Sequence, residues 1–188
     1  MLANGYNMTD RQLWELIVKD DKSAFEMLYR RYYSPLLVYA LRLGFDEDTA
    51  KDCIQDFFVK IYIRRTSYPE LTYIKSYLYR ALTNALLDKV KSVRSNTSSE
   101  DELLSISIED DGLMELFEKS DADVLQAICL KKAYNQLSNK QKRVIYFHYI
   151  QEFSWDEMAT VFEMSPHSCM NLLARAITKL RMLIEEYS

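Results

Sequence analysis

Residues 72–92 concentrate the side chains best suited to contact nucleic acid, on a stretch whose apolar spacing predicts one amphipathic helix. Lysine and arginine follow a phosphate backbone, and tyrosine rings stack on unpaired bases for about 1–3 kcal/mol per base. The combination predicts a surface for melted DNA. The predicted contacts are Tyr73, Lys75, Tyr77, Arg80, Thr83, Asn84, Lys89 and Lys91. The alternative for any one tyrosine is a core position with its hydroxyl at the rim.

The C-terminal part carries a second candidate, a helix-turn-helix. Helices predicted at residues 155–162 and 166–186 are separated only by Glu163, Met164 and Ser165. The side chains predicted to face a DNA groove or its phosphates are His167, Ser168, Met170, Asn171, Arg175 and Lys179. A plain helical hairpin would show the same apolar positions, so this motif alone leaves DNA binding open.

No residue pattern predicts catalysis, a metal or a cofactor. Cys53, Cys129 and Cys169 are far apart and include no CxxC pair, which favours reduced thiols. His148 and His167 have no partner at ligand spacing. A nucleophile with its base, and a phosphate-binding glycine loop, are also missing from the sequence. An enzyme is therefore disfavoured.

The composition predicts an all-α fold. Of 188 residues, 48% are hydrophobic, enough for a packed core, and only three are glycine and three proline. No run of eighteen apolar residues occurs, and the N-terminus lacks the pattern of a signal peptide. We therefore expect a soluble cytoplasmic protein without membrane insertion.

The helix signals divide into two groups. In the first, Thr9 begins a short helix, Ser34 and Pro35 restart the next one, Gly44 stops it, and Asp46 begins another. The second group comprises predicted helices at residues 122–136, 139–150, 155–162 and 166–186. Between the groups, residues 95–123 hold one lysine and ten acidic residues, whereas the rest of the chain sums to plus five. The predicted organisation is two small helical domains, residues 1–94 and 122–188, joined by an acidic flexible linker, residues 95–121.

Two sets of segments resemble one protein family, in the family's order. Region 2 of the extracytoplasmic-function (ECF) sigma factors of bacterial RNA polymerase is similar to residues 24–33 (AFEMLYRRYY), 52–58 (DCIQDFF) within 46–62, and 76–84 (SYLYRALTN). Region 4 is similar to residues 137–144 (LSNKQKRV), 153–159 (FSWDEMA) and 174–181 (ARAITKLR). The resemblance covers residues 10–94 and 122–186.

The resemblance implies a sigma factor that binds core RNA polymerase and promoter DNA and is held by an anti-sigma factor. It implies that a helix carrying Asp52, Gln55, Asp56 and Lys60 docks on the polymerase clamp. Asn84 and its neighbours resemble the part that captures a base flipped from the minus-ten element, and residues 166–186 resemble the reader of the minus-35 element. The linker resembles the segment that runs through the polymerase active-site cleft.

The sequence departs from the family pattern at three places. Tyr77 replaces a tryptophan that is frequent in relatives, Glu163 replaces a frequent glycine, and Met170 and Leu172 replace frequent cations. The promoter preference of relatives is therefore not transferable. Two other functions remain as alternatives: a regulator that uses only the helix-turn-helix, and a helical adaptor that binds only proteins.

Overall fold

The computed structural model describes residues 8–67, 70–93 and 121–187, and in these ranges every regular element is helical. This confirms the predicted all-α fold. The chain forms two compact units, the first with helices α1 to α4 and the second with α7 to α10. The predicted linker, residues 95–121, lies outside the described residues except for Asp121. None of the helices in the described ranges is long and apolar enough to cross a membrane.

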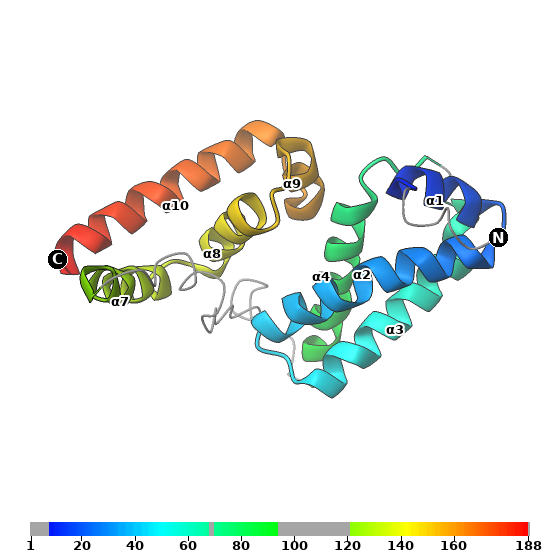
Figure 1. The fold of residues 1–188 in the computed structure, drawn as a ribbon, viewed down its shortest axis with the longest axis horizontal. Coiled ribbons are helices and arrows are strands. Elements are labelled where there is room, and N and C mark those ends of the chain that lie inside the picture. Colours follow the sequence, from blue (N-terminus) through cyan, green and yellow to red (C-terminus); the bar gives the residue numbers. More distant parts are fainter. Residues whose placement is uncertain (1–7, 68–69, 94–120, 188) are drawn as a thin grey trace. The chain divides into compact units, whose positions relative to one another are not determined.

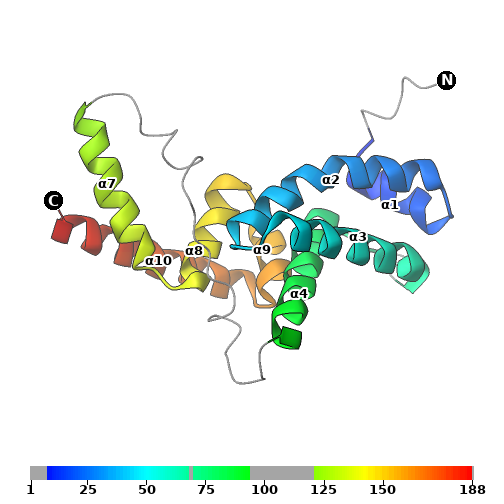
Figure 2. The ribbon, with the colours of Figure 1, turned by 90° about the horizontal axis from the view of Figure 1, so that it is seen from below.

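The first unit is built on α1 (Asp10–Val18), α2 (Lys22–Arg42), α3 (Glu47–Arg64), the short 3₁₀ helix η2 (Arg65–Ser67) and α4 (Ile74–Val93). Figures 1 and 2 show α2 and α3 side by side, with α4 lying across them. The core is aliphatic and aromatic, with Trp14, Leu36, Tyr39, Phe58 and Leu82 almost fully buried. Burial of these side chains supplies the main driving force for folding.

Helix α2 corrects the prediction that a new helix begins at Ser34 and Pro35. The helix continues from Lys22 to Arg42 with Pro35 inside it. An interior proline removes one backbone hydrogen bond and costs about 3 kcal/mol. Tyr32 and Leu36 on either side of the proline are buried on the same face, and this apolar burial offsets the cost.

The predicted starts of α1 and α3 are confirmed by their caps. The Thr9 hydroxyl accepts a hydrogen bond from the backbone N–H of Gln12, whose side chain bonds back to the Thr9 N–H. Asp46 caps α3 through the backbone N–H of Thr49, a bond that lowers the pKa of Asp46. Gly44, at φ 86°, ends the preceding turn in a left-handed conformation.

The second unit comprises α7 (Asp121–Asn135), α8 (Asn139–Ile145), the π-helical turn η3 (Tyr146–Ile150), α9 (Trp155–Phe162) and α10 (Pro166–Tyr187). Helix α10 extends along the unit and contacts α7, α8 and α9 (Figure 1). Capping boxes at Ser138 and Ser154 confirm the predicted starts of α8 and α9.

Helices α9 and α10 share a buried core, as a helix-turn-helix requires, with Met158 and Val161 on α9 and Cys169, Leu173 and Ala176 on α10. Glu163, which ends α9, has φ 53°, so the residue that replaces a glycine does occupy a left-handed position. A residue with a Cβ in this conformation costs about 1 kcal/mol or more relative to glycine. Packing between the two helices compensates for this local cost.

Candidate functional site

Helix α3 presents four of its predicted contact residues to solvent. Asp52, Gln55, Asp56 and Lys60 are all exposed, because the inward face of α3 is occupied by Ile54, Phe57, Phe58 and Ile61. The same outward face also carries two apolar side chains that the sequence analysis did not identify. Val59 is 52% exposed and Ile63 is 68% exposed. We call Asp52, Gln55, Asp56, Val59, Lys60 and Ile63 the α3 stripe.

The α3 stripe combines two chemistries along one helix. The acidic and amide side chains, Asp52, Gln55 and Asp56, come first along the helix. Val59 and Ile63 lie one to two turns further on, and they lie on the same face because residues three or four apart are neighbours on a helix surface. Isolated exposed apolar residues are ordinary, but an adjacent pair bordered by charges is typical of a protein-binding surface. The stripe therefore suits a partner helix with cations opposite the acids and an apolar centre.

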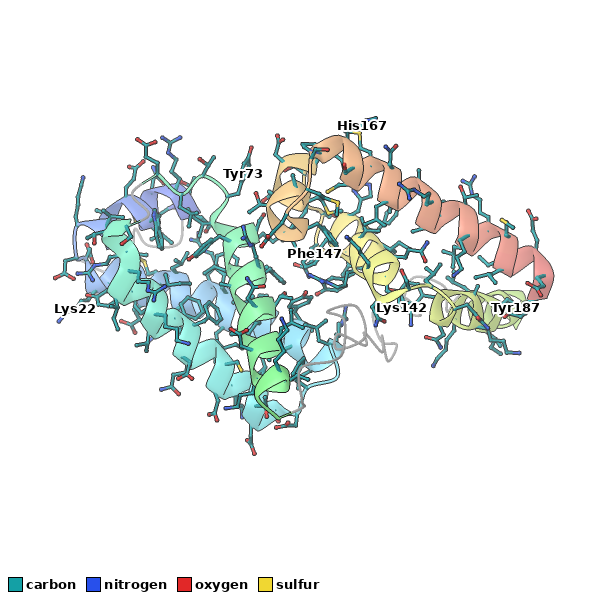
Figure 3. All side chains as sticks on the ribbon, turned by 180° about the vertical axis from the view of Figure 1, so that it is seen from behind. Lys22, Tyr73, Lys142, Phe147, His167 and Tyr187 are labelled. Atoms are coloured by element: carbon teal, nitrogen blue, oxygen red, sulfur yellow. The ribbon has the colours of Figure 1, made fainter. Side chains whose placement is uncertain are left out.

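Helix α4 places most of its predicted DNA contacts at the surface. Tyr73 precedes the helix and is 37% exposed, and Figure 3 shows its side chain projecting from the ribbon. Asn84, Lys89 and Lys91 are exposed, whereas Lys75, Tyr77 and Arg80 are half-buried with part of each side chain accessible.

Thr83 does not lie on this surface. It is 4% exposed, and its hydroxyl donates to the backbone carbonyl of Tyr79 at 2.8 Å and lies 3.1 Å from the hydroxyl of Tyr39. The prediction that Thr83 contacts DNA is corrected on this ground: in the described fold its only polar group is already satisfied inside the core. Thr83 instead helps to fix α4 against α2.

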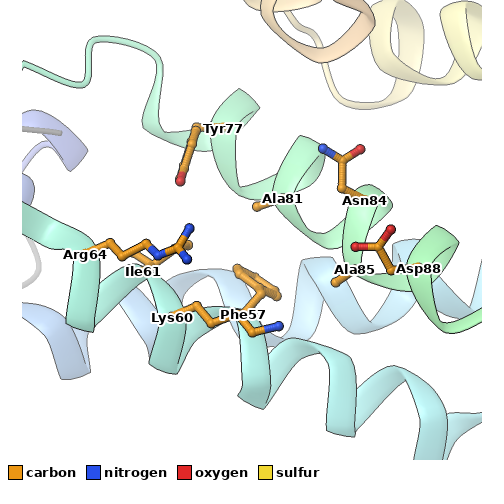
Figure 4. A pocket seen from close by; sticks show the side chains of 9 residues that line it. All are labelled: Phe57, Lys60, Ile61, Arg64, Tyr77, Ala81, Asn84, Ala85 and Asp88. Atoms are coloured by element: carbon orange, nitrogen blue, oxygen red, sulfur yellow. The ribbon is translucent and has the colours of Figure 1, made fainter. Parts of the chain in front are cut away.

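A pocket of about 180 Å³ opens between α3 and α4 (Figure 4). Nine residues line it: Phe57, Lys60, Ile61 and Arg64 from α3, and Tyr77, Ala81, Asn84, Ala85 and Asp88 from α4. It is smaller than the roughly 300–1,000 Å³ typical of sites for drug-sized ligands, and its scale is that of a single planar ring system. The pocket brings Asn84 of the predicted DNA contacts together with Lys60 of the predicted polymerase contacts.

A polar cluster holds the chain where it leaves α3. The carboxylate of Asp20 accepts hydrogen bonds from the Tyr62 hydroxyl at 2.7 Å and from the Arg65 guanidinium at 2.5 Å. The bond from Tyr62 and the positive charge of Arg65 lower the pKa of Asp20. Arg65 also lies over the Tyr62 ring, 4.3 Å from its centroid, and donates to the Tyr62 carbonyl. These contacts fix the start of the connection that leads to α4.

Helix α10 presents all six of its predicted DNA contacts to solvent, and two of them are engaged within the protein. His167, Met170, Asn171 and Arg175 are exposed, with Met170 at 40%, and Figure 3 shows His167 at the start of the helix. Ser168 and Lys179 are also exposed, but each has a hydrogen-bond partner within the protein.

The hydroxyl of Ser168 lies 2.9 Å from that of Ser165, which caps the helix, and the ammonium of Lys179 donates to the carbonyl of Gln136 at 2.9 Å. The Lys179 contact joins α10 to the end of α7. Lys179 is therefore committed to a contact within the protein, and exposed Arg175 is the predicted cation of α10 better placed to bind a phosphate.

The three thiols are free, and Cys53 and Cys169 are buried. Burial raises the pKa of both, which keeps them protonated and weakly reactive at neutral pH. Among the described residues, no group of three or more His, Cys, Asp or Glu side chains is arranged to hold a metal ion.

Comparison with known families assigns both units. The model of sigma-70 region 2 matches residues 28–96, and the model of sigma-70 region 4 matches residues 127–180. The first match covers most of α2, α3 and α4, and the second contains α8, α9 and most of α10.

Curated relatives match along most of their length. The ECF RNA polymerase sigma factor SigM of Bacillus subtilis is 21% identical over 160 residues, covering 83% of this chain and 92% of the relative. The RNA polymerase sigma factor YlaC of the same species is 26% identical over 163 residues, covering 85% and 91%. SigM of Mycobacterium tuberculosis is 22% identical over 181 residues, covering 95% and 86%.

Solved structures share the fold. CnrH, in complex with the cytosolic domain of CnrY, has a TM-score of 0.62 at 22% identity, covering 95% of this chain and 99% of that one. The sigma factor RpoE of Bartonella quintana, in complex with the anti-sigma factor NepR, has a TM-score of 0.57 at 20% identity, covering 86% and 96%. From the two family matches and these relatives, we conclude that the chain belongs to the sigma-70 family, as an RNA polymerase sigma factor of the ECF group.

Proposed function

We propose that this sigma factor binds core RNA polymerase, directs it to specific promoters and promotes promoter melting. The observation that carries the proposal is the presence, in one helical unit, of the exposed α3 stripe beside a ring-sized pocket and an aromatic, cationic α4 surface. A protein-binding surface and a base-sized site on adjacent helices suit a factor that joins polymerase to an opened strand. Nucleotide addition is the work of the polymerase, and this chain acts as an initiation factor in the cytoplasm.

The α3 stripe is the proposed polymerase contact. Its acids, Asp52 and Asp56, attract a basic partner at a distance and set its register, and Val59 and Ile63 supply affinity when water is displaced from them. Because the acids are exposed, reversing their charge changes binding and leaves folding stability nearly unchanged.

The pocket between α3 and α4 is the proposed site for a base that has left the duplex stack. Extruding a base costs a few kcal/mol, and stacking plus hydrogen bonds in a fitted pocket offset that cost. Tyr77 and Phe57 supply rings, and Asn84 supplies an amide able to donate and to accept. Arg80 and the exposed lysines of α4 attract the sugar-phosphate backbone.

The exposed face of α10 is the proposed reader of the upstream promoter element. Residues near the N-terminus of a recognition helix reach the groove floor first, which applies to His167, Met170 and Asn171. An asparagine pairs with adenine through two hydrogen bonds, and an apolar side chain contacts the thymine methyl group. Arg175, two turns further along, suits a phosphate and adds affinity without base preference.

An anti-sigma factor is a further proposed partner. The two solved structures compared above are complexes, CnrH with the cytosolic domain of CnrY and RpoE with the anti-sigma factor NepR. An anti-sigma factor that binds the α3 stripe would cover its exposed apolar residues and prevent the stripe from binding polymerase.

Abortive transcription tests the proposal as a whole. Purified core polymerase is assayed on a library of promoter fragments with and without the chain, and we expect short transcripts from a subset of fragments only when the chain is present. No chain-dependent transcript on any fragment, despite stable binding to core, would contradict the sigma function.

Permanganate footprinting on a promoter found in that assay tests strand opening. Asn84→Ala should reduce the reactivity of unpaired thymines severalfold while duplex binding is retained, because the pocket acts only after the base leaves the stack. Asn135→Ala, at an exposed asparagine of α7, is the matched control. Equal opening by Asn84→Ala and the wild-type chain would assign Asn84 a structural role only.

A further inference from the structure

Charges of opposite sign are separated along the exposed surface of α3. Asp52 and Asp56 lie four residues apart in the α3 stripe, and Lys60 and Arg64 follow with the same spacing. All four side chains are exposed, and within the described part of the chain none of them forms an ion pair. Like charges four residues apart repel each other on a helix surface. The pattern therefore brings the free chain no electrostatic gain.

Other charged helix surfaces of the first unit are arranged differently. Their exposed acids pair with a cation four residues away on the same helix: Glu15 with Arg11, Glu26 with Arg30, and Glu47 with Lys51. The helix dipole favours acids at the N-terminus and cations at the C-terminus, but only within the first and last turn. This accounts for Arg64, at the end of α3, and leaves Asp52, Asp56 and Lys60 unexplained.

A second copy of α3 in antiparallel orientation would supply the missing opposite charges. When two identical helices pack about a two-fold axis, residues at equal distances on either side of the axis face each other. With the axis near residue 58, Asp56 of one copy faces Lys60 of the other, each two residues from the axis. Asp52 faces Arg64 in the same way, each six residues away. The two-fold axis repeats both contacts.

The same arrangement covers the apolar part of the α3 stripe. Val59, which is 52% exposed, lies next to the axis and meets the same residue of the second copy. Ile63, which is 68% exposed, falls between the levels of Gln55 and Asp52 of the second copy, where their methylene groups can cover it. Exposed apolar residues alone do not give this match. Val38 and Leu41 on α2 are also exposed, but residues 27–45 contain no acid that could pair with a cation of a second copy.

We propose that two copies of the chain associate through antiparallel α3 stripes and thereby cover the surface proposed to bind core polymerase. Self-association rests on the charge pattern and the exposure of α3, whereas its regulatory effect rests on the proposed polymerase contact. The interface is one helix face per copy, which is small against the roughly 1,200–2,000 Å² of stable complexes. The dimer is therefore weak and exchanges with monomer. Core polymerase and a second copy compete for the same stripe.

Exchange of charges between copies tests the contact, by sedimentation velocity of the full chain from low to high micromolar concentration. The average mass of wild type should rise from 22.2 kDa toward twice that value. Asp52→Lys with Asp56→Lys makes the stripe wholly cationic, and Lys60→Glu with Arg64→Glu makes it wholly acidic. Each double variant should self-associate at least about tenfold more weakly, because every ion pair becomes a repulsion.

An equimolar mixture of the two double variants should associate again, since the introduced lysines of one face the introduced glutamates of the other. Glu185→Lys with Glu186→Lys, at exposed acids of α10, is the control with the same change in net charge as the cationic variant and should dimerise like wild type. A wild-type chain that stays monomeric throughout overturns the proposal. A mixture that stays monomeric overturns the antiparallel α3 contact.

Energy transfer between donor and acceptor copies, labelled at the N-terminus, tests the regulatory effect. The signal between wild-type copies should fall to its baseline as core polymerase is added and binds. Transfer that persists on polymerase-bound chains overturns the competition. If charge exchange behaves as expected but Asp52→Lys with Asp56→Lys binds core as tightly as wild type, self-association stands and the proposed polymerase contact of α3 is wrong.

Discussion

Replacing Val59 and Ile63 of the α3 stripe by serine should weaken binding to core RNA polymerase by about 30-fold. Full burial of such a side chain is worth about 1.5–3 kcal/mol, and 52% of Val59 and 68% of Ile63 remain to be covered. Docking over both therefore gains about 1 kcal/mol at Val59 and about 1.5 kcal/mol at Ile63. Serine retains the β-carbon, so about 2 kcal/mol is lost, which corresponds to the stated change in Kd.

The measurement is a titration of labelled protein with core polymerase, read by fluorescence anisotropy. Folding stability should change by less than about 0.5 kcal/mol, because these side chains are already largely in water in the free protein. Val38→Ser with Leu41→Ser is the matched control, since these α2 residues are 43% and 41% exposed and lie outside the stripe.

Charge reversal separates the apolar and ionic parts of the same surface. Asp52→Lys with Asp56→Lys should weaken binding most at low salt, where exposed charges act over a longer range, whereas the serine double variant should lose affinity at all salt concentrations. Full affinity of the serine double variant, with a folded protein, would refute the reasoning that α3 docks through its apolar pair.

Four further tests address other parts of the structure. Limited proteolysis should cut first within residues 95–121, and a first cut inside α3 or α4 would contradict the domain boundary. Glu163→Gly should raise the free energy of unfolding by about 1 kcal/mol in urea titration, because glycine removes the left-handed cost at φ 53°. Asp20→Asn should lower the melting temperature at pH 7, and the difference from wild type should shrink as pH falls through the lowered pKa of Asp20, since the protonated carboxyl no longer attracts Arg65. On a library randomised in the upstream element, Arg175→Ala should reduce transcription from all variants alike, whereas Asn171→Ala should flatten the preference at one or two positions, and unchanged preference would remove the readout role.

The sequence by itself determined the elements whose causes are local. The caps at Thr9, Asp46, Ser138 and Ser154 each involve groups within three residues, so the residue types suffice to predict where the helices begin. The same holds for the short turn before α10, in which Ser165 caps the helix through the backbone N–H of Ser168. The family resemblance was likewise visible in the sequence, and the matches to regions 2 and 4 confirm it.

The errors arose where local signals competed with packing. Ser34 and Pro35 have the form of a helix start, but buried neighbours on one face keep α2 continuous. Thr83 has the polarity of a surface residue, but contacts with Tyr39 and Tyr79 hold it in the core. In both cases burial of neighbouring apolar surface outweighs a preference worth a few kcal/mol at most.

Only the tertiary structure decided which side chains form the candidate sites. Apolar periodicity predicts that Phe57 and Phe58 lie on the inner face of α3, but it does not show how much of Val59 and Ile63 remains exposed. The pocket requires α3 and α4 to meet at one particular register, so that Lys60 and Arg64 line the same pocket as Asn84 and Asp88. That register is set by interlocking side chains far apart in the sequence, and a pattern within one helix does not contain it.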